Sequence, residues 1–372
     1  MIIDTVRFSH ILEANGLYDL NQFLTRTAFI ISHKNESLET LVSVIWYLPV
    51  ESPVLILTNC SESERDELRQ NLAERLVRHQ HVYFIHQKDE TIARFFAEHG
   101  VYTILGSDGK VLNGKGEGMY IGALIASLLN YPEWIVFFDA DNFVPSALLE
   151  YTFAMGRLFL QERVSTALDA SEVQHLHNVR ICWSSKPTLG GPIVPGVLGR
   201  CTRVVSPLVA GLVEEWFGLY DSNMISSNAG EQGFSMVTAQ ELHFSSGYSV
   251  ETFQLLDLLS RAHHSDLIAQ PERVLLQQYQ AQSPHFHEKG DEEHINRMIA
   301  DSLGCFEHFK DELPASVKAL VEQTYEQLQL DFRLPIVYPT IRELLRDQHI
   351  LFADAYKISG QKDTIFAQQE AV

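Results

Sequence analysis

Two aspartates in the middle of the chain have the spacing of a metal-binding pair. Asp139 and Asp141 follow the apolar run 135–138, whose β-branched and aromatic residues predict a buried strand. Ligands of open α/β sheets collect just past the carboxyl ends of the strands. Two carboxylates held there about 4 Å apart would repel each other by about 4 kcal/mol at an effective dielectric constant of about 20. A divalent cation would relieve this repulsion, although an Asp-rich turn explains the same residues without any ligand.

A glycine-rich segment precedes this pair by one predicted helix. The sequence N-G-K-G-E-G at residues 113–118 leads into a helical pattern over 119–129. Glycines let the backbone approach a phosphate closely, a helix N-terminus offers N–H donors, and Lys115 adds a positive charge. The spacing is neither that of a P-loop nor that of a dinucleotide-binding fingerprint. Combined with the two aspartates, the segment predicts a pyrophosphate site at the same edge of a sheet.

Two histidines alternate in a proline-led segment, P-H-F-H-E, at residues 284–288. An extended backbone would project His285 and His287 to the same side, where they could chelate a metal ion. The chain has 16 histidines, so a chance pairing in a polar surface loop is the competing explanation.

Other polar segments could bind a sugar or an anion. The segments S-S-N-A-G-E (226–231) and S-S-G-Y-S-V-E (245–251) carry many hydrogen-bonding groups, which suit sugar hydroxyls and turns alike. The segment G-R-C-T-R (199–203) begins a predicted helix, where Arg200 and Arg203 could anchor a phosphate or carboxylate. Surface arginines at an ordinary helix start are the alternative.

Strand and helix patterns alternate in the part of the chain that must position these residues. Buried strands are predicted over 27–32, 53–58 and 82–86, each followed by helical patterning. The strand before Asp139 is the fourth of this series, which indicates a Rossmann-like parallel sheet.

Less regular elements are predicted within this series of strands and on either side of it. Residues 102–112 predict a hairpin around the tight turn 107–110. Residues 1–26 predict an edge element or a short helix, and the chain beyond residue 295 is predicted to be mainly helical.

The composition limits the classes of partner. The formal net charge of −20 argues against nucleic acid or an anionic membrane as the main partner. Four widely spaced cysteines without a C-x-x-C pair indicate a reducing compartment rather than a disulfide framework. The N-terminal residues lack a signal-peptide profile, and no apolar run approaches the roughly 18 residues that span a bilayer. We therefore expect a cytoplasmic protein.

Taken in order, these motifs resemble the mannosyl-3-phosphoglycerate synthase family of retaining glycosyltransferases. The segments that carry the resemblance are H-Q-K-D (86–89), G-K-G-E-G-M (114–119), F-D-A-D-N-F-V-P (138–145), N-A-G-E (228–231), S-S-G-Y-S-V-E (245–251) and S-P-H-F-H-E (283–288). The resemblance implies an α/β fold of the Rossmann-like GT-A glycosyltransferase type with a mainly helical C-terminal extension. Residues 1–260 would form the core that binds the nucleotide sugar and the acceptor, and residues 261–372 the metal loop and a helical region.

The resemblance also implies the reaction, namely transfer of mannose from GDP-mannose to 3-phosphoglycerate with retention. The product would be a precursor of mannosylglycerate, a compatible solute. A divalent cation, Mg²⁺ or Mn²⁺, would be bound by Asp141 and His285, with Asp139 facing the ribose or a metal-bound water. A homodimer is implied by the same analogy.

The site residues implied by the resemblance fall into three groups. The catalytic group is Asp141, Glu251 and Lys115. The donor-binding group is Ser32, Lys34, Asn35, Glu36, Gln87, Lys88, Lys115, Gly116, Glu117, Asp139, Ala140, Asp141, Asn228, Gly230, Glu231 and Glu251. The acceptor-binding group is Gly199, Arg200, Thr202 and His287.

Three alternatives stay open at this point. A related hexosyltransferase could use GDP-glucose or UDP-glucose, or another small anionic acceptor. A sugar-nucleotide nucleotidyltransferase shares the glycine-rich loop, lysine and paired aspartates, but its loop usually follows the first strand directly. A sugar-nucleotide binder without catalytic activity is the third.

Overall fold

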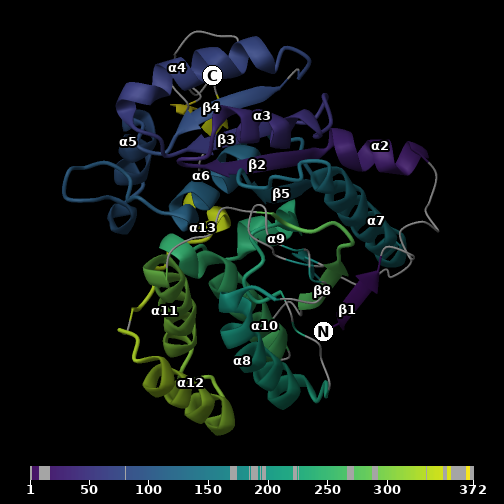
Figure 1. Ribbon diagram of the computed structural model, residues 1–372, viewed down its shortest axis with the longest axis vertical. Coiled ribbons are helices and arrows are strands. Elements are labelled where there is room, and N and C mark those ends of the chain that lie inside the picture. Colours follow the sequence, from purple (N-terminus) through teal and green to yellow (C-terminus); the bar gives the residue numbers. More distant parts are fainter. Residues whose placement is uncertain are drawn as a thin grey trace.

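A mixed sheet of eight strands organises the part of the chain that the structure describes (Figure 1). The computed structural model describes residues 2–7, 17–79, 81–167, 174–183, 185, 192, 194, 198–220, 224, 226–265, 272–286, 292–331, 333–346, 350–352 and 366–368. The strand order is β1-β8-β6-β7-β5-β2-β3-β4. Its strands are β1 (Ile2–Arg7), β2 (Thr27–His33), β3 (Val54–Thr58), β4 (Val82–His86), β5 (Trp134–Asp139), β6 (Gln174–Cys182), β7 (Gln232–Ser235) and β8 (Glu272–Gln280). A separate antiparallel pair joins β9 (Ile350–Phe352) and β10 (Phe366–Gln368).

Helices follow most of the strands. They are α2 (Leu17–Thr25), α3 (Leu38–Trp46), α4 (Glu62–Arg75), α5 (Glu90–Glu98), α6 (Lys115–Leu128), α7 (Ala147–Ala167), α8 (Arg200–Phe217), α9 (Met236–Glu241), α10 (Val250–His264), α11 (Glu292–His308), α12 (Ala315–Leu328) and α13 (Ile341–Leu345). Two short 3-10 helices are η1 (Tyr102–Ile104) and η2 (Gly247–Ser249). None of the described helices combines the length and the apolar character needed to cross a membrane.

The sheet changes direction at β7. Strands β2, β3, β4 and β5 are parallel to one another, and β7 runs antiparallel to both β5 and β6. Beyond β7, the strands β6, β8 and β1 are again mutually parallel. This Rossmann-like α/β arrangement confirms the predicted fold, and the C-terminal helices α11 to α13 confirm the mainly helical extension.

Both faces of the sheet are covered, which explains the unbroken apolar strands. In β2, Ala28 and Ile30 pack in one core cluster with α6, while Phe29 and Ile31 pack in the other with α3 and α7. All four side chains are fully buried. Alternate residues of a strand point to opposite faces, so a strand covered on both faces needs apolar residues at every position.

The N-terminal and C-terminal parts of the chain share this sheet. The edge strand β1 pairs with β8, as Figure 1 shows near the N-terminus, so the prediction of an edge element is confirmed. Strand β8 lies beyond residue 261, so the sheet contains strands from both sides of the expected domain boundary. That boundary stays a prediction.

The prediction of a hairpin at 102–112 is wrong, because the structure has no pair of strands there. Residues Tyr102–Ile104 form the 3-10 helix η1, and only Leu105 and Val111 pair, in a single antiparallel bridge. Ile104 is fully buried, and its carbonyl accepts a hydrogen bond from the Leu112 amide. The turn itself is present, because Gly109 adopts a φ of +72°, which suits glycine.

Helix α6 begins earlier than predicted. Its first residue is Lys115 and its N-cap is Gly114, so the glycine-rich segment forms the first helical turn rather than a loop before it.

Candidate active site

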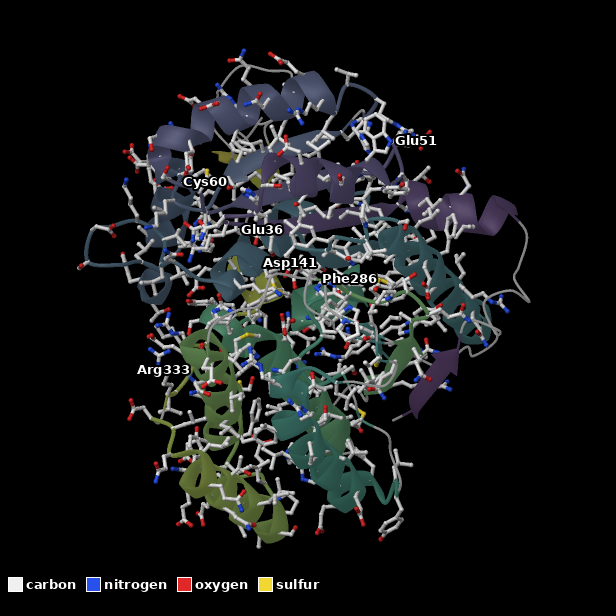
Figure 2. All side chains as sticks on the ribbon, viewed as in Figure 1. Glu36, Glu51, Cys60, Asp141, Phe286 and Arg333 are labelled. Atoms are coloured by element: carbon white, nitrogen blue, oxygen red, sulfur yellow. The ribbon has the colours of Figure 1, made fainter. Side chains whose placement is uncertain are left out.

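Several of the predicted donor-site and metal-site residues lie at the carboxyl edge of the sheet. Ser32 at the end of β2 stands opposite Asp139 at the end of β5. Because β7 is antiparallel to β5, the loop that ends at residue 231 reaches this same edge. In Figure 2, Asp141 and Phe286 lie near each other in the middle of the molecule, above the helices α8, α10 and α11.

Lys115 joins two carboxylates that come from distant parts of the chain. Its Nζ lies 2.6 Å from Asp139 Oδ1 and 2.6 Å from Glu251 Oε1. The Glu251 side chain is only 5% exposed and that of Lys115 only 14%. The first turn of α6, the end of β5 and the start of α10 are therefore tied together by charge.

These charges shift one another's pKa values. Burial lowers the pKa of Lys115, but the carboxylates of Asp139 and Glu251 raise it by more, so the ammonium group stays protonated. Burial raises the pKa of Asp139 to about 6; Lys115 opposes this rise and Asp141 adds to it. At neutral pH the cluster therefore holds a charged lysine beside an ionised aspartate.

Gly230 leaves room for this cluster. A Cβ atom at residue 230 would lie 2.2 Å from Asp139 Oδ2 and 3.0 Å from Lys115 Nζ. Any larger residue would therefore push the two charged groups apart. The predicted role of Gly230 at the donor site agrees with this position beside the ion pair.

His285 lies between two further carboxylates. Its Nδ1 is 3.1 Å from Glu231 Oε1, and its Nε2 is 3.5 Å from Asp141 Oδ1. The ring stacks on Trp183 with a centroid separation of 4.7 Å. Burial lowers the pKa of His285, but Glu231 and Asp141 raise it by more, to about 9.

The segment that carries His285 is anchored by α7. Glu150 accepts hydrogen bonds from the amides of Gln282 at 2.7 Å and Ser283 at 3.0 Å, and from the Tyr279 hydroxyl at 2.8 Å. The His285 amide in turn donates to Ser185 O at 3.0 Å. The imidazole is thus presented by a backbone that is held on both sides.

The donor set at this edge fits a divalent cation. Asp141 offers a carboxylate, His285 an imidazole, and Asp139 stands two residues before Asp141. Mg²⁺ typically binds through one or two protein carboxylates and takes other ligands from water and substrate phosphates. Within the described residues, no three side chains of His, Cys, Asp or Glu are already grouped as a metal site. The set therefore suits an ion whose shell is completed by a bound diphosphate.

The first turn of α6 is packed closely against η2. Gly116 has no room for a Cβ, which would lie 1.8 Å from Ser245 O. Glu117 is buried; its carboxylate accepts from the Gly247 amide at 3.1 Å and from the Tyr338 hydroxyl at 2.7 Å. The buried Gln87 amide donates to Gly114 O at 3.0 Å and to Leu112 O at 2.6 Å. The described contacts of the Glu117 and Gln87 side chains thus hold the first turn of α6, whose binding of a phosphate stays a prediction.

The predicted donor-binding residues between positions 32 and 36 lie at the end of β2 and just after it. Lys34 and Asn35 are exposed, and the Lys34 amide donates to Glu36 Oε2 at 2.7 Å. His33 is buried beneath them and contacts Thr58 Oγ1 at 2.9 Å. A small folded turn with a carboxylate at its tip therefore stands beside the end of β5.

The remaining donor-site predictions lie nearby on supporting elements. Lys88 is partly buried after β4, and its amide donates to His86 Nδ1 at 3.2 Å. Ala140 is fully buried between the two aspartates. Asn228 is buried, and its amide donates to Thr252 Oγ1 and Ser302 Oγ.

The predicted acceptor residues lie at the start of α8. Gly199 is the N-cap, Arg200 is the first helical residue, and Thr202 is buried in the first turn. His287 lies outside the described residues.

Two functional candidates were missed by the sequence analysis. Trp183 stacks on His285, and its indole Nε1 donates to Glu231 Oε2. Arg180 is fully buried in β6 and donates to the carbonyl oxygens of Ser226 and Glu251, at 2.8 and 3.1 Å. The apolar neighbours Val179 and Ile181 were the available signal that Arg180 lies in a strand, whereas nothing in the local sequence distinguishes Trp183.

Comparison with known proteins agrees with the resemblance in the motifs. A family model described as mannosyl-3-phosphoglycerate synthase matches residues 6–349. A relative from Pyrococcus furiosus named mannosyl-3-phosphoglycerate synthase is 30% identical over 299 residues, which are 77% of this chain and 73% of that protein. A relative of the same name from Aeropyrum pernix is 27% identical over 304 residues, covering 78% of this chain and 74% of that protein.

Solved structures of more distant proteins also match. A glucosyl-3-phosphoglycerate synthase from Mycobacterium tuberculosis in complex with uridine diphosphate is 16% identical, with a TM-score of 0.49 over 91% of this chain and 96% of that one.

Proposed function

The chain belongs to the mannosyl-3-phosphoglycerate synthase family, and on this basis we propose that it transfers mannose from GDP-mannose to 3-phosphoglycerate. The observation that carries the proposal is the ion-paired cluster of Lys115, Asp139 and Glu251 at the carboxyl edge of the sheet. It places a permanent cation at a helix N-terminus, beside the paired aspartates, where the leaving group of a nucleotide sugar would sit.

The leaving group of the reaction is a nucleoside diphosphate, on which negative charge develops as the bond to the sugar breaks. Lys115 and the N–H groups of the first turn of α6 are fixed donors aimed at that charge. Gly116 and Glu117 hold this turn in place through their contacts with η2. The protein therefore needs no rearrangement of charge at the moment of bond cleavage.

A divalent cation would be held by Asp141 and His285, with Asp139 beside it. When bound, such an ion would neutralise charge on the diphosphate and so favour its departure. Whether Mg²⁺ or Mn²⁺ is preferred is an experimental question, since both accept carboxylate oxygens.

Transfer on one face of the sugar is the mechanism that the site supports best. A double displacement would need a carboxylate nucleophile, but Glu251 is held at 2.6 Å by Lys115, and Glu231 is fully buried. We therefore propose that the acceptor oxygen bonds to the anomeric carbon on the face that the diphosphate leaves. The acceptor proton passes to the departing phosphate oxygen. Mass spectrometry of the enzyme quenched during turnover tests this mechanism, because a mannosyl adduct on Glu251 would contradict it.

The acceptor would bind at the start of α8. Gly199, Arg200 and Thr202 combine helix N–H groups with one guanidinium, a set suited to a phosphate or carboxylate. The homodimer and the cytoplasmic location stay predictions; the mass of the protein in solution tests the first.

The test of the proposed function is turnover with a panel of donors. We expect GDP release that requires 3-phosphoglycerate, and a product with the mass of mannosyl-phosphoglycerate, when GDP-mannose is the donor. Faster turnover with GDP-glucose or UDP-glucose would instead indicate a related hexosyltransferase. Pyrophosphate release from GTP and mannose 1-phosphate would indicate a nucleotidyltransferase and contradict the proposal.

A further inference from the structure

The Glu231 carboxylate faces two side chains inside the protein, His285 and Trp183. Its side chain is fully buried. Oε1 lies 3.1 Å from His285 Nδ1, and Oε2 accepts a hydrogen bond from the indole of Trp183. The backbone is fixed as well, because the Ile181 amide donates to Glu231 O at 3.0 Å.

This arrangement determines which nitrogen of His285 faces the aspartates. A carboxylate at Nδ1 favours a proton on that nitrogen and orients the ring, so that Nε2 is directed at Asp141, 3.5 Å away. The stacked indole of Trp183 restricts rotation of the same ring. Histidine ligands of metal ions are commonly oriented in this way, by a carboxylate behind the other ring nitrogen.

We propose that Glu231 is a positioning residue, which together with Trp183 holds His285 so that Nε2 is presented to a divalent cation at Asp141. This inference rests on the metal-dependent donor site of the proposed function. It assigns Glu231 a different role from the donor binding that the family resemblance implies, which for this residue would be a contact with the hexose. The Glu231 carboxylate is fully buried and faces His285 and Trp183, which suits a supporting role better than direct contact with a sugar hydroxyl.

The two roles of Glu231 make different predictions when the hexose is absent. A positioning residue affects metal binding with GDP alone, whereas a hexose contact matters only when the donor carries its sugar. The experiment is therefore binding of Mn²⁺ in the presence of saturating GDP, followed by the loss of the free Mn²⁺ signal in electron paramagnetic resonance. No turnover takes place in this assay.

The test variant is Glu231→Gln. The amide removes the negative charge beside His285 Nδ1 and replaces one acceptor oxygen by an NH₂ group, which cannot accept a hydrogen bond. We expect the dissociation constant for Mn²⁺ to rise by about 10- to 100-fold, the usual effect of removing an outer partner of a metal-bound histidine. Trp183→Phe keeps a ring against His285 but removes the indole donor, and we expect a smaller rise in the same direction.

The matched control is Asp257→Asn, which also converts a buried carboxylate to an amide. Asp257 lies on α10, where it pairs with Arg261 of the same helix and contacts His243 Nδ1 at 3.1 Å. Because these partners are not among the residues proposed to hold the metal ion, Mn²⁺ binding should not change. Thermal unfolding checks that each variant is folded; should Glu231→Gln not fold, Trp183→Phe carries the test.

Two results would overturn the inference in distinguishable ways. If Glu231→Gln and Trp183→Phe bind Mn²⁺ as tightly as the wild-type protein, and only the KM for GDP-mannose rises, Glu231 is a hexose contact. If the wild-type protein itself does not bind Mn²⁺ with GDP, the metal-dependent donor site is wrong, and the role of Glu231 is rejected together with it.

Discussion

Lys115 connects residues that are separated by more than a hundred positions in the chain, Asp139 at the end of β5 and Glu251 at the start of α10. Each of the three side chains is mostly buried, so the charges are exposed to little solvent screening. Removing one partner of such a buried cluster is far more costly than losing a surface ion pair, because the remaining charges stay in the protein without compensation.

We predict that Lys115→Met lowers both stability and activity. The free energy of unfolding should fall by about 3–5 kcal/mol because two carboxylates lose their cation. The kcat should fall by about 100- to 1,000-fold, as for loss of one fixed donor to a developing charge. Urea unfolding and steady-state kinetics provide the two measurements.

Lys110→Met is the matched control for that prediction. Lys110 makes only an exposed ion pair with Glu62, so its removal should leave both quantities nearly unchanged. Equal effects of the two substitutions would contradict a special role for the Lys115 cluster.

His177 gives the protein a predictable dependence of stability on pH. It is buried in β6, where Nε2 contacts Gln277 Oε1 at 2.9 Å, and burial lowers its pKa to about 4. An unfolded histidine has a pKa of about 6.5, so between these values only the unfolded chain binds the proton. The contribution of His177 is therefore complete above pH 6.5 and falls by about 3 kcal/mol as the pH drops to 4.

Replacement with a neutral residue tests this pH dependence. In His177→Gln, the loss of unfolding free energy between pH 6.5 and 4 should be smaller than in the wild-type protein by about 3 kcal/mol. Chemical denaturation at half-unit pH steps measures both curves. Parallel curves would show that His177 is not kept neutral in the folded state.

The sequence predicted the residues of the site better than their partners. Asp139, Asp141 and Lys115 were predicted by type and by position after a strand or before a helix, and His285 by its spacing from a second histidine. The contacts of Glu231 and Trp183 with His285 could not be predicted, because the pairing of β6 with β7 and β8 brings them to it.

At the scale of elements, the first turn of α6 packs closely against the segment that leads into η2. The backbone carbonyl of Ser245 occupies the place where any side chain at residue 116 would begin. The C-terminal part of the chain secures the other side of η2, since Ser245 bridges to Val337 and the Ser246 amide donates to Ile336 O at 2.9 Å.

Two glycine substitutions should have opposite effects on stability. Gly116→Ala must displace the backbone at Ser245, so we expect clear destabilisation and weaker GDP binding. Gly211→Ala lies inside α8 with 3.9 Å to the nearest side-chain atom, so it should raise stability by up to about 1 kcal/mol. Thermal unfolding and GDP titration measure both; a tolerated Gly116→Ala would contradict the tight contact.

Tyr338 should contribute to stability and to GDP binding, although it lies 221 positions after Glu117 in the sequence. Tyr338→Phe removes a hydrogen bond to the buried carboxylate of Glu117, so we expect a loss of about 1.5–3 kcal/mol in unfolding free energy and weaker GDP binding. Tyr120→Phe is the comparison, because its hydroxyl donates to the neutral carbonyl of Pro339 and should cost about 1 kcal/mol. Equal losses in urea unfolding would show that the charge of Glu117 is unimportant.

Two strands of the eight-stranded sheet escaped prediction for identifiable reasons. Strand β7 has only four residues, Q-G-F-S, too few to establish a pattern. In β8, the apolar residues are followed by Gln277 and Gln278, which are typical of a surface. Both glutamines are buried and satisfied by His177 and Ser226, contacts that depend on the completed sheet.

At the scale of the whole molecule, one mixed sheet gathers site residues from position 32 to position 285. The reversal at β7 is what makes this possible, because it brings the 226–231 loop to the edge where the parallel strands end. The strand–helix alternation of the first half predicted the parallel part of the sheet. Strand β8 pairs with β6, and β1 pairs with β8. These pairs join segments that lie far apart in the sequence, which local patterns do not encode.

A strongly acidic chain offers little general attraction to the anionic donor of the proposed reaction. Against a net charge of −20, Lys115 and the N-terminus of α6 stand at the sheet edge, where Asp141 and His285 can add a cation. Binding of GDP should therefore depend on the added metal ion far more than on general attraction to the surface.

Acceptor-dependent release of GDP from GDP-mannose, by the wild-type protein and Asp141→Asn side by side with Mn²⁺, tests the central claim most directly. The account predicts rapid release by the wild-type protein only when 3-phosphoglycerate is present, and a loss of at least about 100-fold in Asp141→Asn. Equal rates for the two proteins, or release that does not require the acceptor, would contradict a mannosyl transfer carried out at this edge of the sheet.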